Sequence, residues 1–128
     1  MRGRRLLLGV ILVGLLAASS PAFAHHSWRG FDEANLTTVK GTVTLFDWAN
    51  PHVWIYFEAK DDKGSVQKWS AGGPSPSRMA NTGWDKDTLK IGDQIAFTGN
   101  RNKNGSYEMR LTKITLADGR ELICYGQR

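Results

Sequence analysis

The order of strand and helix signals constrains the fold of this chain more than any other feature. Alternating or β-branched patterns predict strands, and turn residues such as Asp118-Gly119 separate them. A single short helical signal follows the third strand, where Ser75-Pro76 can cap a helix that Gly83 closes. The predicted strands cover residues 38–48, 52–59, 66–71, 94–98, 107–116 and 121–125.

Three strands, a helix and then further strands is the order of the OB-fold, a small Greek-key barrel. We therefore predict an all-β protein with one short helix, built as an OB-like small Greek-key barrel of five to six strands. Gly41, inside the first predicted strand, would let that strand coil sharply, as at a barrel corner. A plain six-stranded barrel or a small sandwich would carry only a turn at the helical signal. Such barrels bind many classes of ligand, so the fold alone does not define a function.

Residues 1–24 are typical of a cleaved signal peptide. Arg2, Arg4 and Arg5 precede an apolar run, and Ala22-Phe23-Ala24 gives the small-x-small pattern that signal peptidase cuts. The apolar run, residues 6–18, is shorter than the roughly 20 residues needed to span a bilayer, so we expect cleavage rather than anchoring. Residues 25–128 are then expected to form a single OB-like β-barrel domain, periplasmic or secreted, with no membrane span after cleavage.

Charge and motif content exclude several classes of function. Removal of the three N-terminal arginines lowers the formal charge from +5 to +2, which is a poor electrostatic footprint for nucleic-acid binding. The sequence has no Ser-His-Asp order, no His-Glu-x-x-His, no Cys-x-x-Cys and no phosphate-binding glycine loop. We therefore expect a binding protein that is not an enzyme, whose partner is an unknown envelope protein or small ligand.

Cys124 is the single cysteine, so no internal disulfide can form. We expect it to be a small buried residue of the last strand. The alternatives are an intermolecular disulfide and a soft metal ligand.

The three histidines form the first candidate site. Cleavage after Ala24 would make His25 the first residue, followed by His26, and the amine and imidazole Nδ1 of His25 can chelate one metal ion. Copper(II) favours nitrogen donors of this kind and stands highest in the divalent affinity order. The third histidine, His52, follows Asn50-Pro51. The sequence thus predicts a metal site at His25, His26 and His52, with copper as the candidate cofactor. The alternative is a flexible histidine pair and a His52 that stabilises its turn through a hydrogen bond.

Aromatic residues form the second candidate site. The chain has five tryptophans, at positions 28, 48, 54, 69 and 84. Because a small barrel fills its interior with large side chains, we expect Trp54 and Trp69 to be mainly core residues. On a barrel face, tryptophans could instead stack on sugar rings or bases. A metal-free interaction module for a protein or glycan would use the Asn-Pro-His corner and nearby tryptophans; its candidate residues are Trp28, Trp48, Asn50 and Trp54.

Several motifs together resemble a family of small exported bacterial proteins of unknown function. They are the Ala-His-His-Ser start at 24–27, Gly-Thr-Val at 41–43, Trp-Ala-Asn-Pro-His-Val-Trp at 48–54, Gly-Trp at 83–84, Leu-Lys-Ile-Gly-Asp at 89–93 and Ala-Asp-Gly-Arg at 117–120. The Asn-Pro-His-x-Trp motif is the most specific of them. The resemblance implies a secreted or periplasmic single domain, and it supplies no activity.

Overall fold

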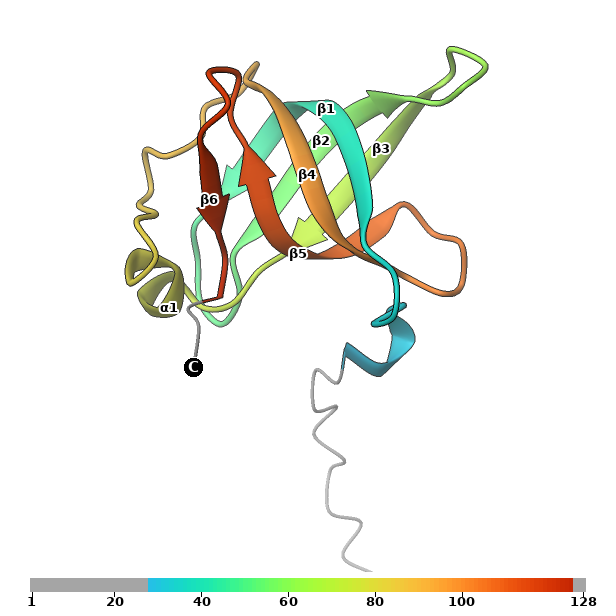
Figure 1. Ribbon diagram of the computed structural model, residues 1–128. Helices are drawn as coiled ribbons and strands as arrows, with labels where there is room; N and C mark the ends of the chain where they lie inside the picture. Colours follow the sequence, from blue (N-terminus) through green and yellow to red (C-terminus); the bar gives the residue numbers. More distant parts are fainter. Residues whose placement is uncertain (1–27, 126–128) are drawn as a thin grey trace, which may run out of the picture.

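The computed structural model describes residues 28–125, which form a barrel with a short helix at one side (Figure 1). A 3-10 helix, Trp28–Gly30, precedes the barrel. The remaining elements are β1 Thr37–Asp47, β2 Trp54–Lys60, β3 Val66–Gly72, α1 Pro76–Ala80, β4 Gln94–Arg101, β5 Glu108–Thr115 and β6 Glu121–Ile123. The predicted order of three strands, one helix and further strands is confirmed.

The sheet closes on itself as a five-stranded barrel. Its strand order is β3-β2-β1-β4-β5-β6, and a further pairing joins β3 to β5. The β3–β5 pairing is parallel and short, from Ser70↔Glu108 to Gly72↔Arg110, whereas the other ladders are antiparallel. With α1 between β3 and β4, this is the OB-fold arrangement, so the predicted fold class is confirmed. The sixth strand, β6, extends the sheet beyond β5.

The first strand bends so that it can pair with two neighbours. Residues 37–42 pair with β4, whereas residues 42–47 pair with β2. A Cβ atom at Gly41 would lie 2.5 Å from the Phe57 ring, so glycine is required where β1 crosses over β2. A bulge between Val43 and Leu45 then changes which side chains point inward. Leu45 is 49% exposed, while Phe46 packs against the core, so simple alternation fails beyond this point.

The fourth strand runs further than the sequence pattern predicted. We expected it to end at Thr98. Instead, a second register shift falls between Thr98 and Gly99, and the strand continues to Arg101. The backbone of Gly99 lies directly against the Arg110 carbonyl oxygen, where no side chain would fit. The Asn100 Nδ2 donates to the carbonyl oxygens of Asp32 and Asn35, so a polar side chain is satisfied within the fold.

Stacked aromatic rings fill the barrel interior. The Phe57 and Phe97 rings are parallel with centroids 3.8 Å apart, and the Trp69 ring also stacks on Phe57, with centroids 5.9 Å apart. Trp69 is buried, as expected, whereas Trp54 lies half-buried on the outer face of β2, so the expectation that it belongs to the core is wrong.

The helix α1 and Cys124, the residue directly after β6, complete the core. The Ser75 side chain accepts a hydrogen bond from the Arg78 amide, so the predicted N-cap is confirmed. Met79 of α1 and Cys124 are both fully buried. Burial raises the pKa of the Cys124 thiol to about 12, which agrees with the expected structural role of this residue. Within residues 28–125, no helix is long and apolar enough to cross a membrane.

Candidate functional site

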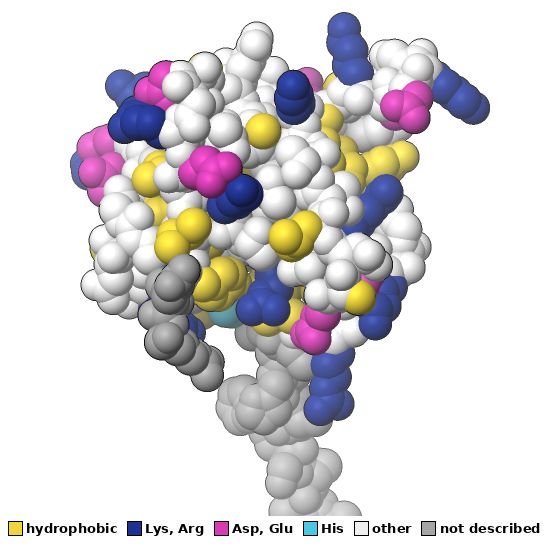
Figure 2. Space-filling model, in the orientation of Figure 1, with side chains coloured by type: hydrophobic (Ala, Val, Ile, Leu, Met, Phe, Trp, Pro, Cys, Tyr) yellow, Lys and Arg dark blue, Asp and Glu magenta, His cyan; other side chains and the backbone are white. Residues whose placement is uncertain are grey.

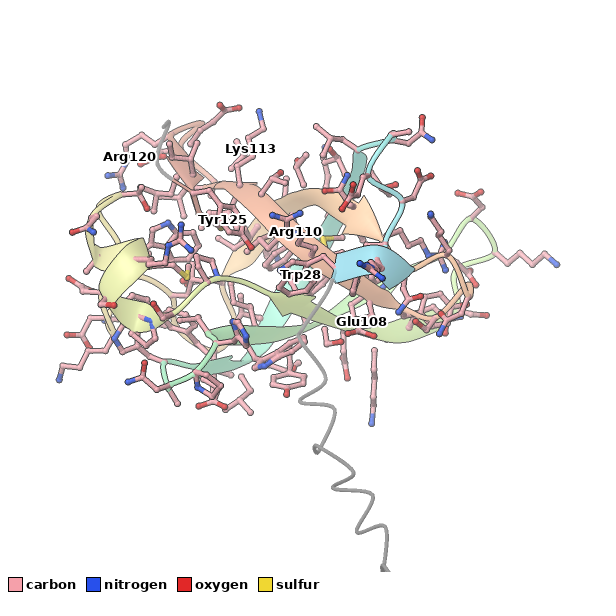
Figure 3. All side chains as sticks on the ribbon, turned by 90° about the horizontal axis from the view of Figure 1, so that it is seen from below. Trp28, Glu108, Arg110, Lys113, Arg120 and Tyr125 are labelled. Carbon is pink, nitrogen blue, oxygen red and sulfur yellow. The ribbon has the colours of Figure 1, made fainter. Side chains whose placement is uncertain are left out.

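Five residues from four separate segments of the chain meet at the end of the barrel where the described chain begins. We call them the Trp28 cluster: Trp28, His52, Trp54, Gly72 and Arg110. Figure 3 views the barrel from this side and shows Trp28 and Arg110 next to each other, with Tyr125 close by. Two of the five, Gly72 and Arg110, were not among the residues that the sequence singled out.

The barrel closure places three of these residues in one row across the sheet. Trp54 of β2 pairs with Gly72 of β3, and Gly72 pairs with Arg110 of β5. Because Gly72 has no side chain, the row has a gap at its centre. A Cβ atom there would lie 3.0 Å from the Trp54 ring and 3.1 Å from the Trp28 ring. Both tryptophan rings therefore lie over the bare backbone of Gly72.

His52 contacts Trp28 from the loop between β1 and β2. The loop turns at a cis bond between Asn50 and Pro51, and His52 follows, half-buried, two residues before β2 begins. Its ring meets the Trp28 ring edge to face, with centroids 6.1 Å apart. We expected the second strand to begin at His52. The strand begins at Trp54, and backbone hydrogen bonds to Gly73 and Pro74 already start at Val53. His52 therefore lies just before the strand.

Arg110 completes the cluster as its charged member. Its guanidinium carbon lies 5.4 Å from the centre of the Trp28 ring and 5.0 Å from that of Tyr125. The Arg110 Nε donates to the Tyr125 hydroxyl at 3.4 Å. The guanidinium thus lies between two aromatic rings, a cation–π arrangement that restricts its side-chain freedom.

The N-terminal segment is fixed to the barrel directly after Trp28. Phe31 is buried, and its ring centroid lies 5.1 Å from that of Trp28. Its backbone forms an isolated antiparallel β-bridge with Asn102. The Asp32 amide donates to the Arg101 carbonyl oxygen. Hydrogen bonds, led by that from the Asn35 side chain, hold the pKa of the Asp32 carboxyl below its usual value. Phe31 and Asp32 thus hold the N-terminal segment against the barrel.

The other predicted binding residues lie outside the cluster. Trp48 packs against Phe46, with centroids 5.7 Å apart, and belongs to the partly buried residues around the core. Asn50 is exposed in the loop before His52. Of the four predicted binding residues, the structure therefore brings together Trp28 and Trp54.

Two parts of the predicted metal site, His25 and His26, lie outside the described residues, as does the predicted signal peptide, residues 1–24. Within residues 28–125, no group of three or more His, Cys, Asp or Glu side chains is placed to hold a metal ion. His52 is the single histidine of this range. Any metal site that uses His52 must therefore take further donors from elsewhere, and the predicted partners are the two N-terminal histidines.

Sequence patterns could not have identified Arg110 or Gly72. Strand alternation places Arg110 on the outer face of β5, but many exposed arginines share that property. Its importance comes from the parallel pairing with β3, which joins segments far apart in the chain. Gly72 carried a signal only in being a glycine at the end of a strand, which often marks close approach of another group.

A hollow lies at the other end of β2. It is a groove of about 870 Å³ whose floor includes Gly41, Ala59 and Ile95, with Lys40 and Lys60 at its rim. The predicted site residues do not line it. Its lining therefore gives no support to the candidate sites argued from the sequence.

Charges of both signs are mixed on the face of the barrel shown in Figure 2. On the face shown in Figure 2, acidic side chains lie between the basic ones, with no block of one sign. Two ion pairs occur within the described chain, Lys113–Glu121 and Arg120–Asp118, both exposed or nearly so. This distribution agrees with the small net charge expected for residues 25–128.

Comparison with known proteins gives one family match. A family model described as a family of unknown function (DUF6152) matches residues 12–110, a range that includes every member of the Trp28 cluster. No curated protein matches the sequence. Among solved structures, the chain is similar to the small single-stranded DNA-binding protein from Streptomyces coelicolor. The identity is 11% and the TM-score 0.41, with 66% of this chain and 94% of that chain covered.

Proposed function

Because this chain belongs to DUF6152, a family of unknown function, we propose its function from the site itself. We propose an exported, periplasmic or secreted binding protein that is not an enzyme and that holds copper(II) at the Trp28 end of the barrel. The donors would be the amine and imidazole of His25, with His26 or His52 completing the set. The supporting observation is the contact between Trp28 and His52.

This contact ties two sequence motifs to the same place. Trp28 ends the His-His-Ser-Trp segment, and His52 belongs to the Asn-Pro-His-Val-Trp motif. Consecutive Cα atoms are 3.8 Å apart, so the Cα atom of His26 is at most about 8 Å from that of Trp28, and that of His25 at most about 11 Å. With Trp28 against His52, the length of the intervening chain would allow all three histidines to reach one metal ion.

The chemistry of the donors suits copper(II). A free N-terminal amine and a neighbouring imidazole nitrogen form a chelate with two nitrogen donors, and further imidazoles add to it in tetragonal geometry. The chelate needs a free amine at His25, so it depends on cleavage after Ala24. The Trp28 ring, which lies against His52, would shield one side of such a site from water.

The first experiment is the intact mass of protein purified from its native compartment, measured under native and then denaturing conditions. We expect a denatured chain that begins at His25 and a native mass larger by one copper ion. A chain that begins elsewhere, or one that is metal-free from copper-replete cells, would contradict the proposal.

Substitution then tests the individual donors. His52→Ala should bind copper more weakly than the wild type in a competition titration, and one residue added before His25 should also weaken binding. The exposed Asn50→Ala variant in the same loop is the matched control and should bind normally. Equal affinities of His52→Ala and the wild type would remove His52 from the site.

A second candidate function is a metal-free interaction module for a glycan or a protein of the envelope. It is favoured by a separate observation, the two tryptophan rings that meet over Gly72 beside Arg110. Copper should leave the tryptophan fluorescence of such a module unchanged, whereas envelope extract should shift it. We propose no nucleic-acid partner for either version, in view of the mixed surface charge.

A further inference from the structure

Two arginines in this barrel each contact two aromatic rings. The Arg101 guanidinium carbon lies 5.0 Å from the Trp69 ring centre and 5.3 Å from that of Tyr107. The Arg110 carbon lies 5.4 Å and 5.0 Å from the ring centres of Trp28 and Tyr125. Each guanidinium thus has one tryptophan and one tyrosine beside it, and their hydrogen bonds can be compared.

The two guanidinium groups differ in what they bind. The Arg101 Nε donates to the Ser106 carbonyl oxygen at 3.2 Å, and its Nη2 donates to that of Gly105 at 3.0 Å. Arg101 thus holds the loop between β4 and β5. Within residues 28–125, Arg110 donates through Nε to the Tyr125 hydroxyl, and its two Nη atoms have no protein acceptor. A guanidinium has five N–H donors, so four of those of Arg110 are left for a ligand or water.

An aromatic surface extends from Arg110 across the neighbouring strands. The Trp54 and Trp28 rings cover Gly72, which is the residue next to Arg110 in the row. The Trp54 ring stacks on Tyr56, with centroids 6.5 Å apart and an interplanar angle of 28°. Tyr56 is 37% exposed. A ligand bound to the guanidinium can therefore place a ring over flat apolar surface, where aromatic side chains contribute most to binding.

The charges on this face limit how much negative charge a ligand can carry. Glu108 lies two residues before Arg110 on the same outer face of β5, as Figure 3 shows. Asp47 lies at the opposite end of the row from Arg110: Asp47 pairs with Trp54, Trp54 with Gly72, and Gly72 with Arg110. The one positive charge of Arg110 neutralises one carboxylate, and further anionic groups would be repelled by Glu108 and Asp47. The face therefore suits a monocarboxylate rather than the backbone of a nucleic acid or a polyphosphate.

We propose that Arg110, Trp28 and Trp54 bind a hexuronic acid residue of an acidic glycan. The carboxylate would accept two parallel N–H donors from Arg110, the bidentate geometry that a guanidinium favours. The apolar C–H face of the sugar ring would lie against the tryptophan rings. This inference rests on the second candidate function, the interaction module, and names its ligand class; it does not involve copper.

A matched pair of sugars tests the role of the carboxylate. Methyl β-D-glucuronide and methyl β-D-glucoside have the same ring and differ in the carboxylate. Calorimetric titration of the metal-free protein should give an affinity for the glucuronide at least about tenfold higher, as expected for a charge-assisted bidentate pair. The glucuronide should also change the tryptophan fluorescence, because Trp28 and Trp54 would be covered.

Variants then assign the preference to Arg110. Arg110→Gln should remove the difference between the two sugars, and Arg110→Lys, which keeps the charge without the planar fork, should retain a part of it. Lys113→Gln, on the same strand, is the control for loss of one positive charge and should bind like the wild type. Trp54→Ala should weaken the binding of both sugars. Near-UV circular dichroism establishes that each variant is folded.

The possible results separate this inference from the function on which it rests. Equal binding of both sugars by the wild type would overturn the carboxylate site and leave the glycan module standing. An undiminished preference in folded Arg110→Gln would also overturn it. Failure of both sugars to bind would overturn both the carboxylate site and the glycan version of the module. The copper proposal is tested separately, by the titration of His52→Ala.

Discussion

The backbone of Gly72 lies directly beneath the ring of Trp28, so close that a Cβ atom at this position would be 3.1 Å from the ring. Trp28 comes from the segment before the barrel, and Gly72 ends β3. The bare backbone of one strand thus gives the N-terminal segment its place against the barrel, beside His52 and Arg110.

Gly72→Val should therefore displace Trp28 and Trp54 together. We expect the variant to lose about 1–3 kcal/mol of unfolding free energy, as is typical when side-chain atoms are added to a packed site. Urea unfolding followed by circular dichroism measures the loss, and the tryptophan emission should shift towards that of exposed indole. Ser70→Ala, two residues earlier on the same face, is the control and should change little. A Gly72→Val protein with wild-type stability and emission would contradict the contact.

Because of the bulge in β1, truncation of two adjacent apolar residues should change the unfolding free energy by very different amounts. Phe46 packs against Trp48 and Trp84, so Phe46→Ala should cost about 2 kcal/mol or more of unfolding free energy. Leu45 is 49% exposed, and Leu45→Ala should stay within about 0.5 kcal/mol of the wild type. Chemical denaturation of both variants measures the difference. The reverse order of stabilities would mean that the strand alternates without a bulge.

Cys124 should lower the stability of the fold at high pH. Burial raises the pKa of its thiol from 9.0 to about 12, so the folded state keeps a proton that the unfolded state loses. Unfolding free energy should therefore fall as the pH rises above about 9, and the fall should continue to about 12. Cys124→Ala lacks this thiol, so the difference between the two proteins in urea unfolding at several pH values isolates its effect.

The same burial predicts a slow reaction of Cys124 with thiol reagents. The thiolate is the reactive form, and in the folded protein it is both rare and covered. Labelling with a chromogenic disulfide at about pH 8 should be slow in buffer and complete in denaturant. Fast labelling of the native protein would show that the last strand opens readily.

Asp61 should behave as the organising acid of the β2–β3 hairpin. Its carboxylate accepts hydrogen bonds from the Ser65 and Lys63 amides, both at 2.9 Å, and from the Gln67 side chain at 3.2 Å. These bonds, that of Ser65 above all, lower the pKa of Asp61. The stabilisation is therefore present above the ordinary carboxyl pKa of 3.8 and is lost as the pH falls through the lower value in the folded state.

An NMR titration checks this prediction. The Asp61 carboxyl carbon should titrate with a midpoint below 3.8, and the Ser65 amide shift should follow it. In Asp61→Ala, the Ser65 amide should exchange faster with solvent, while the core amides of β4 should keep their protection. A Ser65 amide that neither follows the titration nor exchanges faster would rule out this hydrogen bond.

Much of the fold could be predicted because its signals are local. The Ser75 cap and the Asp118-Gly119 hairpin each depend on a few adjacent residues, and both lie where the sequence indicated. The errors arise where strands meet distant partners. In β1, a bulge leaves Leu45 exposed and Phe46 against the core, so simple alternation fails there. The strand β4 continues through Gly99, whose backbone fits against Arg110.

The candidate site was predictable only in part, for the same reason. Trp28, His52 and Trp54 carried a sequence signal as members of two unusual motifs. Nothing local distinguished Arg110 from other exposed arginines, because its surroundings come from β3, the N-terminal segment and Tyr125.

By itself, the sequence determined the number, order and character of the elements, because alternation, capping and turn formation are properties of neighbouring residues. It also determined which residue types are available for binding. The tertiary structure decided which of them meet. The parallel closure of β3 on β5 puts Gly72 beside Arg110, and the missing side chain at Gly72 admits the Trp28 ring, which in turn contacts His52. These contacts join segments far apart in the chain, so they exist only once the barrel has closed.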